Sequence, residues 1–592
     1  MLCWFFLFGG QEPFAEPPPV FQNPRITDLK PARASQLIGE VMGRPKAEET
    51  VGRDTTRRRK KEKALRRELS GPDPIVRIGL MEEYDRIEFT VRGDYDIVTL
   101  GGQTIEKRSK GGQRWRVLPS KTIEARAIYS VLTTAFASRE AADSLRKVLA
   151  LGNQPARVVE VGEQIMIDSR MVADNIKYRV LVGRWPTPRE ATRHLDEFRD
   201  EFAPRVVRQV IDPASGMIQL DNLTRDQSQD VEIGFRMIPR QDSCMITLHD
   251  VREGTGFHWE REVDRSYPGI IEIRVDHRGL LMAVTELPLE LYLKGVVPSE
   301  MPASYPMEAL KAQAVAARSE ALARIGMRHP NDPFDLCAHV HCQAYSGCTH
   351  HDDRASKAVE DTRGYVLIAD SMVAEAVYSS CCGGHTEDKL SVWNPPDAAH
   401  LHGHWDAAPD AKLPGRLDLT TEKGVAKWIG SSPPVWCNTA EFPKLPESLK
   451  KAASSFRWEL TYSRRELEEI IRRKTGEDVG TLINIIPLQR GVSGRMMEME
   501  ILGTRKNLRL QRELNIRNAL SPTYLRSACF VVSYEAGEDG MPLTFHLRGA
   551  GWGHGVGMCQ VGAGVMAANG KSFKAILNHY YQGTKVEKIY GQ

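Results

Sequence analysis

The chain has 592 residues, which is long enough for three or more domains with sizeable cores. Its hydrophobic content of 41% and its charged content of 27% are ordinary for a globular protein. A net charge of +3 is too small to indicate a nucleic acid partner, and no apolar run is long enough to predict a membrane-spanning helix.

Residues 1–72 predict a disordered, basic N-terminal arm. Its apolar start, Met1–Phe8, is short and has no positive leading segment. It is either an incomplete or atypical export signal, or a loose tail behind a mis-set start. Nine Lys and Arg residues lie among the fifteen residues from Arg53 to Arg67. Such a run either contacts an anionic polymer or a membrane surface, or forms a solvated linker.

Two ranges contain short runs that alternate between apolar and polar residues. The first, residues 73–122, includes Ile75–Leu80 and Arg86–Val91 with glycine-containing turns between them. The second, residues 213–285, includes Ile270–Val275. The alternation predicts a β-rich segment at 73–122 and a β-rich connector at 213–285.

An internal repeat lies between these two ranges. Tyr129–Leu132 and Tyr178–Gly183 each predict a strand, and each is followed by Arg-Glu-Ala and an amphipathic helix. Two such units can share one sheet with both helices on one face. The pattern resembles the sporulation-related repeat (SPOR) domain, a small α/β module that binds peptidoglycan. The resemblance implies a SPOR-like glycan-binding domain at 123–212, with 153–177 as a long insert; a purely structural domain is the alternative.

Five motifs follow in order from residue 286 onward. They are the Val-Pro-Ser-Glu-Met-Pro run around Glu300, the Lys-Ala-Gln-Ala-Val-Ala-Ala-Arg run ending at Arg318, and the segments Phe334–Tyr345, Tyr378–Glu387 and Gly551–Gln560. The second run lies inside a predicted helix that starts at Pro306 and stops at Gly326. Together they resemble the stage II sporulation protein D family, which includes the lytic amidase enhancers. The resemblance implies a mixed α/β domain at 286–592, interrupted by an insertion at about 407–455. The chain departs from the family pattern at Cys559 and Val561, where a serine and a tryptophan are expected.

This resemblance implies peptidoglycan remodelling in the cell envelope, in a periplasmic or other extracytoplasmic compartment, with glycan strands as the partner. The implied reaction is that of a lytic transglycosylase, which cleaves the MurNAc–GlcNAc bond of peptide-poor glycan to a 1,6-anhydro product. The alternative is a non-catalytic enhancer that activates a cell-wall amidase. For the whole chain we predict an α+β, multidomain fold.

Glu300 is the predicted acid and base. It lies between Pro298, Met301 and Pro302, and apolar surroundings raise the pKa of a carboxyl group. One carboxylate suffices here, because the 6-hydroxyl of muramic acid is an internal nucleophile. A helix-end carboxylate without a catalytic task is the alternative. Arg318 lies within a helix of small residues and needs an anionic partner or a ligand, so it is either catalytic or part of a structural ion pair.

Five of the ten cysteines lie between residues 337 and 382, which indicates a local site rather than a disulfide scaffold. Cys337, His341 and Cys342 can occupy three corners of a zinc tetrahedron, with His329, His339 or a distant residue as the fourth ligand. We predict a structural zinc ion, with His329 as the fourth ligand, and no organic cofactor. A disulfide between Cys337 and Cys342, or free thiols, is the alternative.

Four further residues predict substrate contacts. Tyr378 and His385 flank two adjacent cysteines and two glycines, and Trp552 and His554 lie in the Gly551–Gly555 turn. The glycines permit a tight backbone, and a tryptophan presented on such a turn can stack against a sugar. Purely structural turns are the alternative for both motifs.

Overall fold

The computed structural model describes residues 66–69, 73–198, 202, 204–254, 260–393, 397–413 and 417–591. Most of the predicted N-terminal arm, including the export signal, lies outside these residues. The end of the basic run is described and is ordered: β1 (Arg66–Glu68) pairs in parallel with β9 (Gln164–Ile167), and Leu69 is buried. Arg67 forms an ion pair with Asp335. Disorder up to residue 72 is therefore wrong for this short segment.

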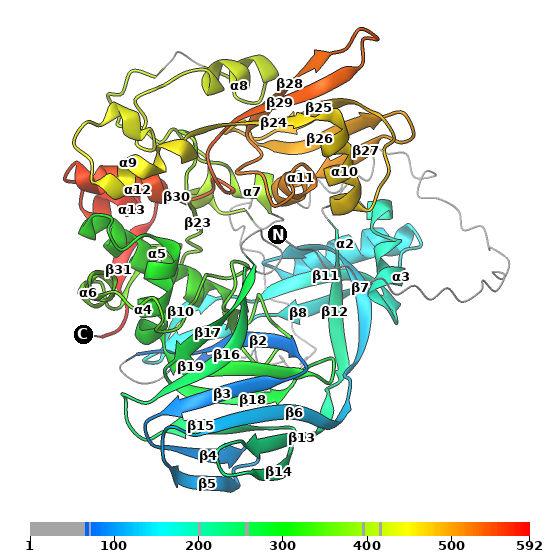
Figure 1. Cartoon of the computed structure of the whole chain (residues 1–592). Coiled ribbons are helices and arrows are strands. Elements are labelled where there is room, and N and C mark those ends of the chain that lie inside the picture. Colours follow the sequence, from blue (N-terminus) through cyan, green and yellow to red (C-terminus); the bar gives the residue numbers. More distant parts are fainter. Residues whose placement is uncertain are drawn as a thin grey trace, which may run out of the picture.

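The two β-rich ranges form one two-sheet unit (lower part of Figure 1). One sheet has the order β20-β2-β19-β18-β15-β4-β5 and the other β14-β13-β6-β3-β16-β17. The strands are β2 (Ile75–Tyr84), β3 (Ile87–Arg92), β4 (Tyr95–Thr99), β5 (Thr104–Ser109), β6 (Arg114–Ile123), β13 (Ser215–Asn222), β14 (Gln227–Glu232), β15 (Gly234–Pro239), β16 (Met245–Glu253), β17 (Arg261–Tyr267), β18 (Ile270–Val275), β19 (Leu281–Pro288) and β20 (Leu336–Cys337). Phe89, Trp115 and Phe235 lie in their shared core. Both sheets contain strands from before and after the repeat, so the predicted segment and connector are not separate units.

The repeat folds as the strand–helix pattern predicts. Its four strands form an antiparallel sheet of order β12-β7-β11-β8, carrying α2, α3 and the short η2 (cyan in Figure 1). The elements are β7 (Arg126–Phe136), α2 (Arg139–Leu151), β8 (Ala156–Val161), β11 (Lys177–Trp185), α3 (Pro188–Thr192), η2 (Asp196–Phe198) and β12 (Arg205–Asp212). Ser138 and Thr187 cap the two helices through their hydroxyl groups. Within the predicted insert, β8 joins this sheet. Strands β9 and β10 (Arg170–Asp174) form a separate sheet, in which β9 pairs with β1 and β10 pairs with β9.

A helical layer continues directly from the two-sheet unit. Strand β19 leads into α4 (Leu289–Glu300), and α5 (Met307–Arg324) is almost wholly buried by its neighbours. Those neighbours are α4, α6 (Asp353–Asp361), α12 (Gln560–Ala568), α13 (Phe573–Tyr580) and the sheet of β21 (Tyr365–Ala369), β22 (Met372–Val373) and β31 (Lys585–Lys588). The predicted stop is confirmed, because Gly326 has φ +75° just beyond α5. The small residues of α5 permit this close packing on several sides.

The remaining elements form the upper part of Figure 1. Two three-stranded sheets, β24-β29-β28 and β25-β26-β27, share a core with α10 and α11. The elements are β23 (Tyr378–Ser379), α7 (Lys389–Val392), η3 (Ala399–Leu401), α8 (Glu422–Ile429), η4 (Thr439–Glu441), α9 (Glu447–Lys450), η5 (Lys451–Ser455), β24 (Arg457–Ser463), α10 (Arg464–Thr475), β25 (Leu482–Arg490), β26 (Met496–Gly503), β27 (Leu508–Gln511), α11 (Glu513–Ala519), β28 (Phe530–Ala536), β29 (Pro542–Ala550) and β30 (Met558–Cys559). The segment 407–455 lies within the main core, where Trp428, Val435 and Cys437 are buried.

None of the helices in the described part of the chain has the length and apolar character needed to cross a membrane.

Candidate functional site

Glu300 is the last residue of α4, and it is held at two points. Its Oε1 accepts a hydrogen bond of 2.7 Å from the backbone N–H of Ala344. Its carbonyl oxygen accepts one of 3.0 Å from Nε2 of Gln560, the first residue of α12. Burial raises the pKa of Glu300 to about 7, and the Ala344 N–H offsets only part of this effect. A helix C-terminus also disfavours a negative charge. The group is therefore suited to exchange a proton near neutral pH.

The side chain of Tyr378 lies near Glu300. Its hydroxyl donates a 2.8 Å hydrogen bond to Oε1 of Gln343, whose Nε2 donates to the carbonyl of Ala317 on α5. Burial and the charge of Glu300 raise the pKa of Tyr378 well above its usual value, so the phenol stays protonated. Gln343 and Ala344 are adjacent in one loop. That loop therefore positions both the carboxylate of Glu300 and the hydroxyl of Tyr378.

Arg318 belongs to the scaffold. Its side chain is fully buried on α5 and forms two hydrogen bonds of 2.7 Å to the carboxylate of Glu290 on α4. It also donates to the carbonyl of Tyr365 on β21. The structure contains the predicted structural ion pair, and the side chain has no exposed surface for direct contact with a substrate. A role of Arg318 in catalysis stays a prediction. The missing information was its partner, Glu290, 28 residues earlier in the chain.

The four predicted zinc ligands come together. One donor atom each from His329, Cys337, His341 and Cys342 lies within 4.8 Å of the other three. The Cys342 sulfur is 3.4 Å from His329 Nε2, and both sulfurs are 3.7 Å from His341 Nδ1. Two sulfurs and two imidazole nitrogens are a donor set that zinc accepts in structural sites. His329 Nδ1 meets Asp332, which fixes the ring and leaves Nε2 for a metal. The residues fit the ion.

The remaining predicted substrate residues differ in their access. Trp552 is 40% exposed, and the guanidinium group of Arg526 lies over its ring. His554 is half-buried, and burial lowers its pKa to about 3. Val556 N–H donates to its Nδ1, so Nε2 carries the proton and donates to the carbonyl of Tyr378.

His385 is buried against Trp405, and burial lowers its pKa to about 4. Its Nδ1 donates a 2.6 Å hydrogen bond to the carbonyl of Thr386.

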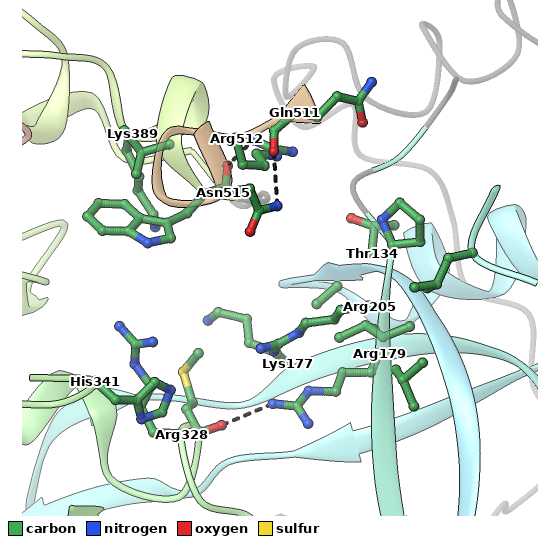
Figure 2. A pocket seen from close by; sticks show the side chains of 18 of the residues that line it. Thr134, Lys177, Arg179, Arg205, Arg328, His341, Lys389, Gln511, Arg512 and Asn515 are labelled. Atoms are coloured by element: carbon green, nitrogen blue, oxygen red, sulfur yellow. Dashed lines mark hydrogen bonds between the residues drawn. The ribbon is translucent and has the colours of Figure 1, made fainter. Parts of the chain in front are cut away.

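A large basic cavity lies between the repeat and the later domain (Figure 2). Its volume is about 670 Å³. The cationic residues that line it are Lys177, Arg179, Arg205, Arg324, Arg328, Lys389, Arg509 and Arg512. Among the described residues of the lining, Glu375 is the one acidic side chain. Within the described residues, Arg179, Arg205 and Arg328 form no ion pair. Burial lowers the pKa of Arg179 to about 10, and a bound anion would relieve that cost.

The cavity adjoins the Glu300 site without containing Glu300. His341, one of the zinc-ligand candidates, lines it. Trp393 also lines it, and its ring lies 4.8 Å from the ring of His554, which in turn contacts Tyr378. The sequence did not predict Trp393, Gln343 or Gln560 as site residues, because each reaches the site only through the fold. Of the three, Gln343 could have been predicted from the sequence, because it directly follows Cys342 in the motif Phe334–Tyr345.

Residues 277–368, which include Glu300 and all four candidate zinc ligands, match the family model described as stage II sporulation protein. Over these residues the chain is similar to the stage II sporulation protein D family. Residues 387–557 match a domain of unknown function. The match to the sporulation domain confirms the family predicted from the motifs, but it does not extend to the SPOR-like part.

Three relatives illustrate the similarity. An uncharacterized protein of Brachyspira hyodysenteriae is 29% identical over 53% of this chain and 70% of its own length. The amidase enhancer of Bacillus subtilis is 28% identical over 49% of this chain and 40% of its own length. The stage II sporulation protein D of Bacillus amyloliquefaciens is 25% identical over 56% of this chain and 84% of its own length.

Proposed function

We propose that the protein remodels peptidoglycan in the cell envelope and acts as a lytic transglycosylase with Glu300 as its acid and base. The observation that carries this proposal is the setting of Glu300. It is a carboxylate at a helix end with a pKa of about 7, and it is held by the Ala344 N–H beside the hydroxyl of Tyr378. A single carboxyl group with such a pKa can donate a proton and then take one back.

Glu300 donates one proton and recovers one proton in each turnover. The protonated carboxyl donates to the oxygen that links C1 of MurNAc to GlcNAc, and the C1–O bond breaks. The 6-hydroxyl oxygen of the same MurNAc then bonds to C1, and its proton passes to the Glu300 carboxylate. The enzyme returns to its starting form, the product carries a 1,6-anhydro ring, and no water is consumed. This is why a second catalytic carboxylate is unnecessary.

The basic cavity supports a peptide-poor substrate. When the stem peptide is removed, the lactyl group of MurNAc ends in a free carboxylate, so a stripped strand is a regular polyanion. Arg179 and Arg205 from the repeat and Arg328 beside the metal loop provide cations for it, and none of them pairs with an acidic side chain in the described part of the chain. The SPOR-like prediction for 123–212 is consistent with this assignment, since the repeat would then hold the strand while the sporulation domain cleaves it.

A zinc ion bound by His329, Cys337, His341 and Cys342 would have a structural task. All four positions are filled by protein ligands, and a closed site of this kind cross-links the chain without reacting. The last of these ligands, Cys342, directly precedes Gln343 and Ala344 in the chain. The four side chains would therefore fix the loop that holds Glu300.

The test uses purified full-length chain and glycan strands freed of peptides. Mass spectrometry should detect 1,6-anhydro products, with no new reducing ends, for the parent protein. Glu300→Gln keeps the hydrogen bond from Ala344 but has no transferable proton, so turnover should fall by roughly 10²–10⁴-fold. Glu459→Gln, an exposed glutamate on β24, is the matched control and should keep full activity. Equal turnover by the parent protein and Glu300→Gln would exclude this residue.

A second candidate function follows from the similarity to the Bacillus subtilis amidase enhancer. An enhancer would bind glycan and stimulate a separate cell-wall amidase. The same glycan experiment separates the two functions if an amidase is added in a parallel reaction. No anhydro product from the parent protein, together with faster peptide release by the amidase, would assign the chain to the enhancer class.

A further inference from the structure

A second cluster of metal-binding side chains lies in the core, away from the His329 group. Cys382, Asp406, Cys437 and Cys559 each present one donor atom, and these atoms all lie within 4.8 Å of one another. All four side chains are buried: Asp406, Cys437 and Cys559 are 0% exposed and Cys382 is 3% exposed. Four such groups converging in a dry core are costly unless something satisfies them.

The spacing fits a zinc tetrahedron. With zinc–sulfur bonds of about 2.3 Å, two sulfurs on one ion lie about 3.8 Å apart. The Cys382 and Cys437 sulfurs are 3.6 Å apart. A sulfur and a carboxylate oxygen on one ion would lie about 3.5 Å apart. The observed distance from the Cys382 sulfur to Asp406 Oδ2 is 3.2 Å. Small adjustments would place all four donors on one ion.

The surroundings provide the outer hydrogen bonds that metal ligands require. Backbone N–H groups of Cys382 and Gly562 donate to the Cys559 sulfur at 3.2 and 3.4 Å, and Gly384 N–H donates to the Cys382 sulfur. Donors of this kind stabilise a thiolate. The other oxygen of Asp406, Oδ1, accepts a 2.8 Å hydrogen bond from Tyr580, which leaves Oδ2 directed at the cluster. In protein metal sites, the side chains that bind the metal are typically held in place by hydrogen bonds to other groups of the protein.

We propose that Cys382, Asp406, Cys437 and Cys559 bind a second structural zinc ion. Three thiolates and one carboxylate favour zinc over magnesium or calcium, which prefer oxygen ligands. Closed four-ligand coordination leaves no position for substrate, so this ion is structural. The proposal does not depend on the activity proposed for Glu300.

The ion would join parts of the chain that are far apart in sequence. Asp406 and Cys437 lie within 387–557, the segment matched to a domain of unknown function, and Cys382 and Cys559 lie just outside it. Cys559 caps α12, whose first residue, Gln560, bonds to the carbonyl of Glu300. The second zinc would therefore fix the later domain against the wall of the candidate active site.

Metal content of the full-length chain, purified without added metal, tests the proposal. We expect about two zinc ions per chain by elemental mass spectrometry, by the usual occupancy of closed sites. Cys437→Ser should lower the count to about one, and so should Cys342→Ser, which removes a ligand from the other site. Cys529→Ser is the matched control, because Cys529 is equally buried but its sulfur faces the carbonyl of Ser493. It should keep both ions.

Two measurements on the parent protein keep the test decisive if a variant fails to fold. Zinc X-ray absorption should give an average between two and three sulfurs per ion, whereas the His329 site alone would give two. Alkylation under denaturing conditions should find Cys382 and Cys437 as free thiols once the metal is removed. A single zinc with two sulfurs would overturn the proposal, and so would a disulfide between Cys382 and Cys437.

Discussion

The raised pKa of Glu300 predicts a specific link between pH and stability. Burial raises this pKa from 4.5 to about 7 in the folded protein, whereas an unfolded chain keeps the ordinary value. Between these two pH values the folded state holds a proton that the unfolded state has released. Stability is therefore lost as the pH rises from about 4.5 to about 7, and the loss is complete above that.

The magnitude follows from the same pKa values. Each pKa unit corresponds to 1.36 kcal/mol, so the ionised carboxylate costs at most about 3 kcal/mol of unfolding free energy. Part of the Glu300 side chain is accessible, and solvent screening reduces this ceiling to roughly 1–3 kcal/mol. Glu300→Gln stays neutral at every pH and keeps the hydrogen bond from Ala344. It should therefore match the parent protein near pH 4 and be more stable by roughly 1–3 kcal/mol at pH 8.

Urea unfolding at several pH values, followed by tryptophan fluorescence, measures this difference. The transition of interest is the one that includes α4 and α5, since other parts of the chain can unfold separately. Glu459→Gln, the exposed control on β24, should not reproduce the divergence. Parallel stability curves for the parent protein and Glu300→Gln from pH 4 to pH 8 would refute the raised pKa, and with it the physical basis for Glu300 as an acid near neutral pH.

Three further outcomes follow from the structure. Arg318→Met should cost about 3–5 kcal/mol in urea unfolding, because it leaves Glu290 buried without its partner, and adding Glu290→Gln should recover part of that loss. Arg179→Ala with Arg205→Ala should weaken binding to peptide-free glycan roughly tenfold and reduce its salt dependence, while the exposed Arg193→Ala should not. Chelation of zinc should lower the midpoint of thermal unfolding, and a metal-free preparation of full thermal stability would contradict a structural zinc.

The sequence was most informative where the decisive contacts are local. The repeat at 123–212 was predicted from strand and helix periodicity, and its sheet has the expected helices. The start and stop of α5 followed from Pro306 and Gly326, because proline and glycine act on their own backbone. The first metal cluster lies within fourteen residues of chain, from His329 to Cys342. The residue types indicated Cys337, His341 and Cys342, and they left the fourth ligand open between His329, His339 and a distant residue.

Long-range pairing was the part that the sequence did not provide. Strands of 73–122 and 213–285 share two sheets. The alternation of apolar and polar residues predicts each strand, but it does not specify which strand is its neighbour. Arg318 was singled out correctly as a buried charge, but its partner Glu290 could not be identified by spacing. Asp406 and Cys437 lie 24 and 55 residues from Cys382, so no short motif joins them. In each case the fold supplies the neighbour.

These contacts explain why Glu300 depends on such distant parts of the chain. Its carboxylate is held by the loop that follows Cys342, and its backbone by Gln560, the residue after Cys559. Each of these supports is adjacent to a different cysteine cluster. A rigid loop would hold the Ala344 N–H against the carboxylate, and a rigid α12 would keep the end of α4 in place. Losing either support would therefore alter the pKa of Glu300 before it altered the overall fold, so the pH at which cleavage is fastest is the sensitive readout for both clusters.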